Sequence, residues 1–240
     1  EKLIDSKGRE NDFVTETDRN NEEIIFKKLR QHFPHHKFIG EETSSVSGLP
    51  ELTDEPTWIV DPVDGTTNFI HRNPLTCVSI GLAINKIPVL GVVYSPCSGD
   101  ELFVAIRGHG AYLNGERIHV SGSQTIGDSI VLTEFGYERT TQGIQTICST
   151  LQNVILAGPH AIRSLGSGVL DLCYLATGRL DAVYAGVAGE SWCPWDYCAG
   201  WVIIEEAGGI LMTLDHENRQ FYMYSKSILA ASSLQLGNEL

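Results

Sequence analysis

Residues 58–69 read WIVDPVDGTTNF, and this stretch places two aspartates directly after an apolar run. Asp61 and Asp64 have only Pro62 and Val63 between them, so a backbone that turns there lets the two carboxylates converge. Carboxylates that close repel each other, and removing them from water costs free energy. The segment is therefore either an ordinary surface turn or a place where a positive charge is bound.

Three further acids follow predicted strands or open predicted helices, namely Glu41, Glu42 and Asp196. Such a set of oxygen ligands suits a hard cation, above all Mg²⁺, and the lack of histidine and cysteine among them argues against zinc. For any single acid, a helix-capping turn is the ordinary interpretation. Five acids that follow apolar strands or open helices favour a metal site instead.

Gly65, Thr66 and Thr67 come next, at the predicted start of a helix. Backbone N–H groups at a helix start favour a phosphate oxyanion. Two magnesium ions around a phosphoryl group would neutralise its charge, orient a water molecule and stabilise the leaving oxygen. The residues thus indicate metal-assisted hydrolysis of a phosphate ester.

A helix is expected ahead of these groups. Residues 15–34 read TETDRNNEEIIFKKLRQHFP, with cap-type residues at Thr17 and Asp18 and a proline at position 34. Apolar residues recur at helical spacing between the cap and the proline. The stretch predicts an amphipathic helix of about four turns that ends at Pro34.

Strands are expected to deliver the acids. KFIG, residues 37–40, predicts a short strand before Glu41, and TWIVD, residues 57–61, predicts a buried one. Three apolar stretches within residues 75–107 predict an antiparallel meander, and Asn114-Gly115 predicts a hairpin.

The second half alternates helices and strands, which predicts an α/β arrangement. The expected order is a helix at 143–152, a strand at 153–158, a helix at 167–178, a strand at 180–185, a helix at 195–209 that glycines terminate, and strands at 210–212 and 228–231. We expect one domain, 1–240, with a metal-binding α+β half at 1–119 and an α/β half at 120–240.

Composition restricts the class of protein. The chain has 240 residues, is 42% hydrophobic and carries a formal net charge of −13, which argues against nucleic acid or an acidic membrane as partner. Its six cysteines form no CxxC pair and are interpreted as reduced thiols of a cytoplasmic protein, an organellar one not being excluded. The polar start at Glu1 predicts that an N-terminal helix is missing.

Four motifs resemble those of the inositol monophosphatase family, a set of Mg²⁺-dependent, lithium-sensitive phosphomonoesterases. They are DFVTETD, FIGEE, WIVDPVDGTTNFIH and WDYCAGWVIIEEAGG, and the likeness runs from Lys7 to about Ala231. The resemblance implies a mixed αβ fold, a five-layered α-β-α-β-α sandwich of the sugar phosphatase type. It also implies a homodimer.

The resemblance implies a role for each motif residue. The ligands of two to three Mg²⁺ ions would be Glu41, Asp61, the Val63 carbonyl, Asp64 and Asp196. Gly65 and Thr66 would contact the phosphate. Thr66, with Asp18 behind it and Glu41 beside it, would activate the attacking water, and no covalent phosphoenzyme would form.

The resemblance also suggests a substrate pocket. In the segment RSLGSG, the candidates are Gly166, Ser167 and Gly168, while the alcohol would leave near Asp196. Inositol-specific members carry a glutamate where this chain has Ala185, and Glu190 is the candidate replacement. Tyr137 stands where a small hydroxyl residue is common, which would narrow the pocket.

The expected reaction is hydrolysis of myo-inositol monophosphate to inositol and phosphate. The same chemistry on L-galactose 1-phosphate or another sugar phosphate, histidinol phosphate or a nucleotide phosphate is the alternative. An inactive metal-binding or regulatory homologue is the alternative from a different class.

Two other phosphatase chemistries are disfavoured by the residues. An aspartate nucleophile would need a D-x-D spacing, whereas Asp61 and Asp64 are D-x-x-D. CYLATGR, residues 173–179, has the Cys-x5-Arg spacing of cysteine phosphatases, but its apolar residues recur at helical spacing, so Cys173 is predicted to be structural.

Overall fold

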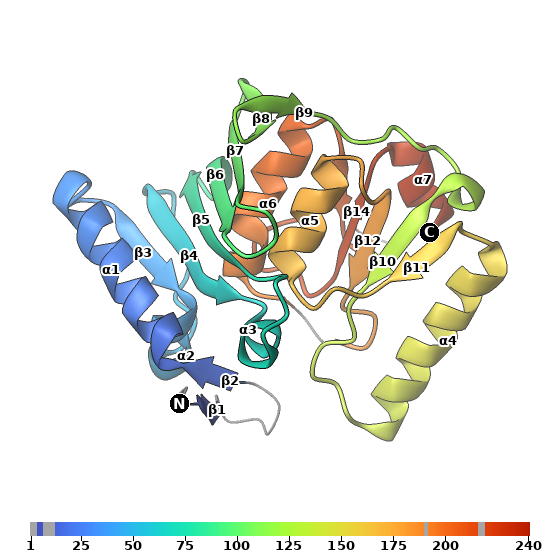
Figure 1. The fold of residues 1–240 in the computed structure, drawn as a ribbon, viewed down its shortest axis with the longest axis horizontal. Helices are drawn as coiled ribbons and strands as arrows, with labels where there is room; N and C mark the ends of the chain where they lie inside the picture. The colour runs from blue at the N-terminus through green and yellow to red at the C-terminus, as the bar shows by residue number, and fades with distance from the viewer. Residues whose placement is uncertain (1–3, 7–12, 190–191, 216–218) are drawn as a thin grey trace.

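The computed structural model describes residues 4–6, 13–189, 192–215 and 219–240. Its helices are α1 (Glu16–His32), α2 (Glu41–Ser47), α3 (Thr66–His71), α4 (Thr141–Ala157), α5 (Gly168–Ala176), α6 (Pro194–Glu206) and α7 (Leu234–Glu239), with a 3-10 turn at Ile126–Asp128. Helices and sheets alternate in five layers, with α5 and α6 between two sheets (Figure 1). The expected α-β-α-β-α sandwich is confirmed.

The first sheet holds the strands of the N-terminal half. Its strand order is β3 (Lys37–Gly40), β4 (Thr57–Asp64), β5 (Cys77–Ile84), β6 (Ile87–Ser95), β7 (Glu101–Ile106), β8 (Gly110–Leu113) and β9 (Glu116–Ile118). Only β3 and β4 pair in parallel, and the rest of this sheet is antiparallel. The predicted meander and the predicted hairpin are both present, and Asn114 and Gly115 both have positive φ, as its tight turn requires.

The second sheet holds the strands of the C-terminal half. Its strand order is β11 (Ala161–Arg163), β10 (Ile130–Thr133), β12 (Ala182–Ala185), β14 (Ile228–Ala231) and β13 (Ile210–Met212). The first three are parallel, and β14 pairs antiparallel with both of its neighbours. A small antiparallel pair, β1 (Ile4–Ser6) and β2 (Phe13–Thr15), precedes α1.

Helix α6 packs very closely on the first sheet because two strand glycines leave room for it. A Cβ atom on Gly81 would lie 2.3 Å from the Cys198 Sγ, and one on Gly91 would lie 2.5 Å from the Ala199 carbonyl oxygen. Any side chain at either glycine would therefore push the helix away. This close contact fixes where α6 begins, and Asp196 lies in its first turn.

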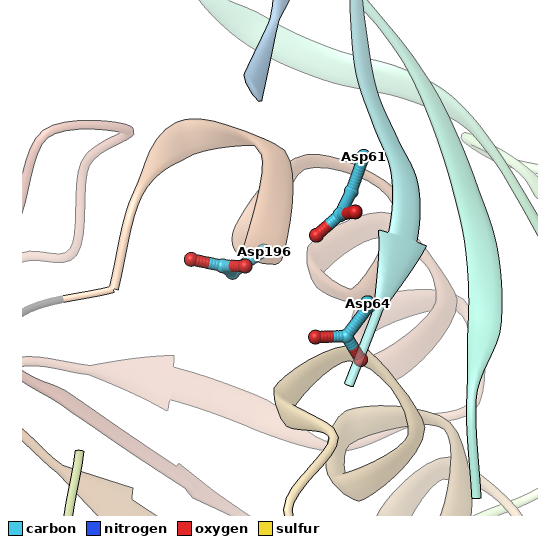
Figure 2. Close-up of side chains that lie close together, drawn as sticks. All are labelled: Asp61, Asp64 and Asp196. Carbon is cyan, nitrogen blue, oxygen red and sulfur yellow. The ribbon is translucent and has the colours of Figure 1, made fainter. Parts of the chain in front are cut away.

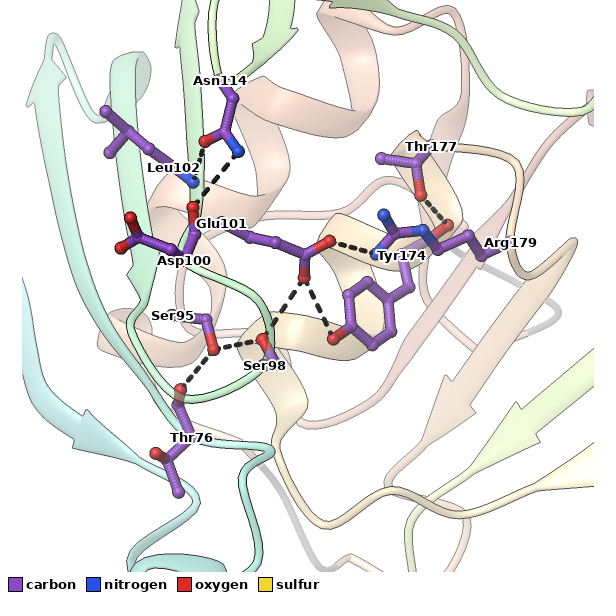
Figure 3. A network of polar contacts seen from close by, with 10 residues as sticks. All are labelled: Thr76, Ser95, Ser98, Asp100, Glu101, Leu102, Asn114, Tyr174, Thr177 and Arg179. Carbon is purple, nitrogen blue, oxygen red and sulfur yellow. Dashed lines mark hydrogen bonds and ion pairs between the residues drawn. The ribbon is translucent and has the colours of Figure 1, made fainter.

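A polar network ties the first sheet to α5 (Figure 3). The buried Glu101 carboxylate forms an ion pair of 2.6 Å with Arg179 Nη1 and accepts hydrogen bonds from the Tyr174 hydroxyl and the Ser98 hydroxyl, each at 3.3 Å. Ser98 in turn contacts Ser95. The layers are thus joined by charge as well as by apolar packing.

Two local expectations are wrong. Residues 153–158 were expected to form a strand, but α4 continues to Ala157 and ends at Gly158 in the left-handed conformation. Val154 lies seven residues after Ile147 and is buried on the same helix face, so packing outweighs the β propensity of this stretch. Helix α1 is capped by Thr15 rather than by Thr17 or Asp18.

The strands divide between the two sheets on either side of residue 120, since β9 ends at Ile118 and β10 begins at Ile130. One apolar core, however, contains buried residues of both halves. The division into sub-lobes stays a prediction. Within the described ranges, no helix combines the length and the apolar character that crossing a bilayer requires.

Candidate metal centre

Three aspartates converge where the two halves of the fold meet. Asp61 and Asp64 lie at the end of β4, and Asp196 lies in the first turn of α6 (Figure 2). One carboxylate oxygen of each lies within 4.8 Å of one of each of the others. The pairing of β4 with β5 shifts register between Asp61 and Asp64, and this irregularity lets both side chains face the same space.

Burial makes this cluster electrostatically unfavourable by itself. Asp61 is 2% exposed and Asp64 is 8% exposed. Burial, followed by the charges of Glu41, Asp64 and Asp196, raises the pKa of Asp61 well above its usual range. Burial also raises the pKa of Asp64 to about 6, although hydrogen bonds from Ser167 and Val169 oppose the rise. The cluster needs a compensating charge to stay ionised at neutral pH.

The chain compensates these two acids only in part. Asp64 accepts hydrogen bonds from the Ser167 hydroxyl and, at 3.0 Å, from the Val169 N–H, while Asp61 accepts one from the Val63 N–H at 3.0 Å. All of these donors are neutral. Converging carboxylate oxygens that are held by neutral donors fit a hard divalent cation such as Mg²⁺.

Glu41 lies beside this group but is not among the three acids that converge. It is the first residue of α2, and its charge and a side-chain hydrogen bond contribute to the raised pKa of Asp61. Glu22 holds the start of α2, because its carboxylate accepts hydrogen bonds from the N–H groups of Glu42, at 2.8 Å, and Thr43, at 2.9 Å. No local pattern predicts this support, since Glu22 and α2 are about twenty residues apart in the chain.

Thr66 stands next to the cluster with two acceptors. Its Oγ1 lies 3.2 Å from Asp18 Oδ1 and 3.1 Å from the Val63 carbonyl oxygen, so its single proton has a choice of partner. Asp18 is fully buried and also accepts hydrogen bonds from the backbone N–H and the hydroxyl of Thr15. Gly65, in the left-handed conformation, makes the turn from β4 into α3.

The predicted substrate segment lies on the other side of Asp64. Ser167 is 1% exposed, and its hydroxyl donates to Asp64, a contact that the sequence did not predict. Gly166 has a positive φ and lies next to the Asn68 amide, while Gly168 lies against the Trp192 ring. Glu190 lies outside the described residues. Ala185 is buried in β12, and Tyr137 is 40% exposed.

Cys173 cannot be a nucleophile. It is fully buried in α5, and burial raises the pKa of its thiol well above its usual range. The prediction of a structural role for this cysteine is confirmed.

Comparison with known proteins identifies the family. The model of the inositol monophosphatase family matches residues 1–239. Inositol monophosphatase 1 of Solanum lycopersicum is 50% identical over 222 residues, which is 92% of this chain and 78% of that protein.

Solved structures agree with the sequence relatives. The extragenic suppressor protein SuhB of Bartonella henselae superimposes with a TM-score of 0.84 at 34% identity, over 99% of this chain and 86% of that one. Staphylococcal IMPase-II, solved with inositol monophosphate bound, superimposes with a TM-score of 0.77 at 27% identity, over 92% of this chain and 81% of that one. This chain belongs to the inositol monophosphatase family.

Proposed function

We propose that this protein hydrolyses inositol monophosphate to inositol and phosphate, as a metal-dependent phosphoric monoester hydrolase. The observation that carries the proposal is the convergence of Asp61, Asp64 and Asp196 within 4.8 Å, in a chain that is 50% identical to a plant inositol monophosphatase. The inositol monophosphatase family is metal-dependent, and its members typically use Mg²⁺ and are inhibited by lithium.

Two to three Mg²⁺ ions are proposed, held by the family's ligand positions. Glu41, Asp61 and the Val63 carbonyl would hold one ion, and Asp61, Asp64 and Asp196 would hold another. When bound, the ions would neutralise the phosphoryl oxygens and lower the pKa of a water molecule.

The chain's own residues supply orientation and proton transfer. Thr66 Oγ1, backed by Asp18 at 3.2 Å, would orient a water molecule for attack on phosphorus opposite the ester oxygen. The new bond joins the water oxygen to phosphorus, the phosphorus–ester bond breaks, and the water's proton passes to a neighbouring carboxylate such as Glu41. The leaving oxygen would take up a proton from a second water molecule and depart as the alcohol beside Asp196, while Gly65 and Thr66 would contact the phosphate.

The substrate assignment draws support from the relatives, since a staphylococcal relative was solved with inositol monophosphate bound. Gly166 and Gly168 are the proposed contacts to the polyol, and Ser167 acts from the same segment. Glu190 is proposed to replace the family's glutamate. The second candidate is another sugar or nucleotide phosphate, because the short, buried Ala185 has no group that reaches a hydroxyl.

One experiment separates these functions. Phosphate release would be measured from inositol 1-phosphate, galactose 1-phosphate, histidinol phosphate and an adenosine 2′-phosphate, with Mg²⁺ or with a chelator. We expect the highest kcat/KM for the inositol ester, no release with the chelator, and inhibition by millimolar lithium. A higher kcat/KM for another ester would reassign the substrate, and phosphate release with the chelator would refute the metal chemistry.

A homodimer is also proposed, from the resemblance to the family. Sedimentation at micromolar concentration would test it, with twice the monomer mass of 26.3 kDa as the expected result.

A further inference from the structure

Asp171 is a buried acid that the proposed reaction does not use. It lies in the first turn of α5 and is 0% exposed, and neither carboxyl oxygen accepts a hydrogen bond from a donor among the residues that the structure describes. Burying an ionised carboxylate without a donor costs more free energy than a helix N-terminus returns. The ionised form is therefore the wrong state for this site.

The groups that act on Asp171 make ionisation still less favourable. Burial, followed by the negative charges of Glu134 and Asp64, raises the pKa of Asp171 well above its usual range. Glu134 is close enough for a side-chain hydrogen bond to Asp171, yet two ionised carboxylates can only accept. A single proton between the two acids turns their repulsion into a hydrogen bond.

The surroundings decide which acid carries the proton. Glu134 accepts hydrogen bonds from the Ser164 hydroxyl at 3.0 Å, the Leu165 N–H at 2.7 Å and the Gly166 N–H at 2.8 Å. These donors favour the ionised form of Glu134. Asp171, which has no such donors among the described residues, is the acid that keeps the proton.

This pair lies directly behind the segment that supports the acid cluster. Glu134 binds residues 164–166, and the next residue, Ser167, donates its hydroxyl to Asp64. The Asp171 N–H also donates to the Ser167 carbonyl oxygen at 3.0 Å. The Glu134 carboxylate thus holds residues 164–166, while the backbone of Asp171 holds Ser167, the residue that donates to Asp64.

We propose that Asp171 is a positioning residue that works as a neutral acid: its carboxyl proton is donated to Glu134, and the pair holds residues 164–167 so that Ser167 supports Asp64. The proposal rests on the proposed function for the role of Asp64, but not for the protonation of Asp171. Asp171 is neither a proposed metal ligand nor a proposed substrate contact.

Infrared spectroscopy tests the protonation without any substrate. The spectrum of the Mg²⁺-loaded protein at pH 8 would be compared with those of Asp171→Asn and Glu101→Gln. We expect the carbonyl band of a protonated carboxylic acid in the parent protein and in Glu101→Gln, and its loss in Asp171→Asn. If that band is missing from the parent protein, or persists in Asp171→Asn, Asp171 is ionised and the proposal fails.

A second variant tests the partner. Glu134→Gln replaces the carboxylate acceptor by a weaker amide acceptor, while burial, the largest cause of the raised pKa of Asp171, stays the same. Asp171 should therefore stay protonated, and its infrared band should move to higher frequency because the hydrogen bond is weaker. A band that stays unchanged in this variant would show that Glu134 is not the acceptor, which also overturns the proposal.

Kinetics test the positioning role. Asp171→Asn is neutral and keeps a donor, so kcat and the Mg²⁺ concentration for half-maximal rate should stay within about threefold of the parent values. Asp171→Leu has similar size and no donor, and we expect about a tenfold loss of kcat with a higher Mg²⁺ requirement. Circular dichroism would select a temperature at which both variants are folded.

The conservative variant decides between positioning and simple packing. A folded Asp171→Leu with full activity, or an Asp171→Asn as impaired as Asp171→Leu, would overturn the role. If Asp171→Leu does not fold, the kcat of Asp171→Asn and the infrared spectrum of Glu134→Gln still test the proposal. If the protein releases no phosphate from inositol phosphates, only the proposed function is contradicted. The protonation of Asp171 is unaffected, because the infrared measurement does not depend on activity.

Discussion

Two groups of buried carboxylates in this molecule, one around Glu101 and one around Asp61 and Asp64, are neutralised in different ways. The Glu101 carboxylate, near the start of β7, is met by Arg179, Tyr174 and Ser98, so its charge is balanced inside the chain (Figure 3). Asp61 and Asp64, at the end of β4, converge with a third acid and receive hydrogen bonds only from neutral donors among the described residues (Figure 2).

Burial alone therefore does not mark a functional acid. What marks it is the source of the opposite charge. Glu101 draws that charge from an arginine of the same chain, whereas the aspartate cluster leaves it to an ion from solution. Asp171 represents a third solution, a carboxyl group that keeps its proton. Variants of the Glu101 network and variants of the aspartate cluster should therefore have different effects.

The largest effect is expected from Asp64→Asn. The change removes one ligand charge from the cluster, and a loss of about 4 kcal/mol of transition-state stabilisation corresponds to about a thousandfold lower kcat. Folding should stay nearly normal, because asparagine keeps an acceptor for Ser167 and Val169. Phosphate release and thermal unfolding would be measured together.

Glu101→Gln is the matched control, since it also neutralises a buried acid. It should leave kcat per folded molecule unchanged while lowering stability. Nearly full activity in Asp64→Asn would contradict the role of the aspartate cluster. A loss of kcat in Glu101→Gln as large as that in Asp64→Asn would show that the two regions do not differ in function.

The second effect concerns pH in the metal-free protein. The pKa of Asp64 is raised from 3.8 to about 6, so the folded state holds a proton that the unfolded state has already released between these values. The contribution of Asp64 to the free energy of unfolding is therefore fully present below pH 4. It is lost as pH rises through 6, and the loss is about 3 kcal/mol. The raised pKa of Asp61 acts in the same direction.

Urea unfolding with a chelator, from pH 4 to pH 8, measures this fall. Added Mg²⁺ should restore stability above pH 6, because the bound cation favours the ionised form of the clustered carboxylates. The same titration of Asp64→Asn should be flatter. A metal-free protein whose stability rises between pH 4 and pH 6 would contradict the raised pKa values.

The third effect compares two hydroxyl groups. Thr66→Ala removes the group that would orient the attacking water, and we expect about a hundredfold loss of kcat. Thr66→Ser keeps the hydroxyl and should retain most of the rate. Ser95→Ala removes a fully buried hydroxyl of the Glu101 network, which donates to the Thr76 carbonyl oxygen at 2.7 Å, and should affect stability alone. Equal kcat losses in Thr66→Ala and Ser95→Ala would contradict the role of Thr66.

The smallest effect is expected from Arg179→Met. The variant leaves the Glu101 carboxylate without its cation, but the arginine side chain is 46% exposed, so water replaces part of the interaction. We expect a loss of about 1–2 kcal/mol in the free energy of unfolding and no change in the Mg²⁺ requirement. A shifted Mg²⁺ requirement would mean that the two regions are coupled.

Most helices and strands, and the chemistry of the acids, could be predicted from the residues alone. Periodicity identified α1 and the meander, and terminal glycines marked the end of α6. The WIVDPVDGTTNF motif identified Asp61 and Asp64 as acids that need a cation. These features are local, because a few consecutive residues fix the turn, the strand or the cap. The strand expected at residues 153–158 failed because a buried helix face, not propensity, decided its conformation.

Contacts between distant segments depend on how the layers pack. Asp196 is more than 130 residues from Asp64, and their convergence depends on α6 packing against Gly81 and Gly91. The supports of the site, Glu22 under α2 and Ser167 beside Asp64, are likewise contacts between segments far apart in the chain. No local pattern encodes such contacts, because they exist only once the layers have packed.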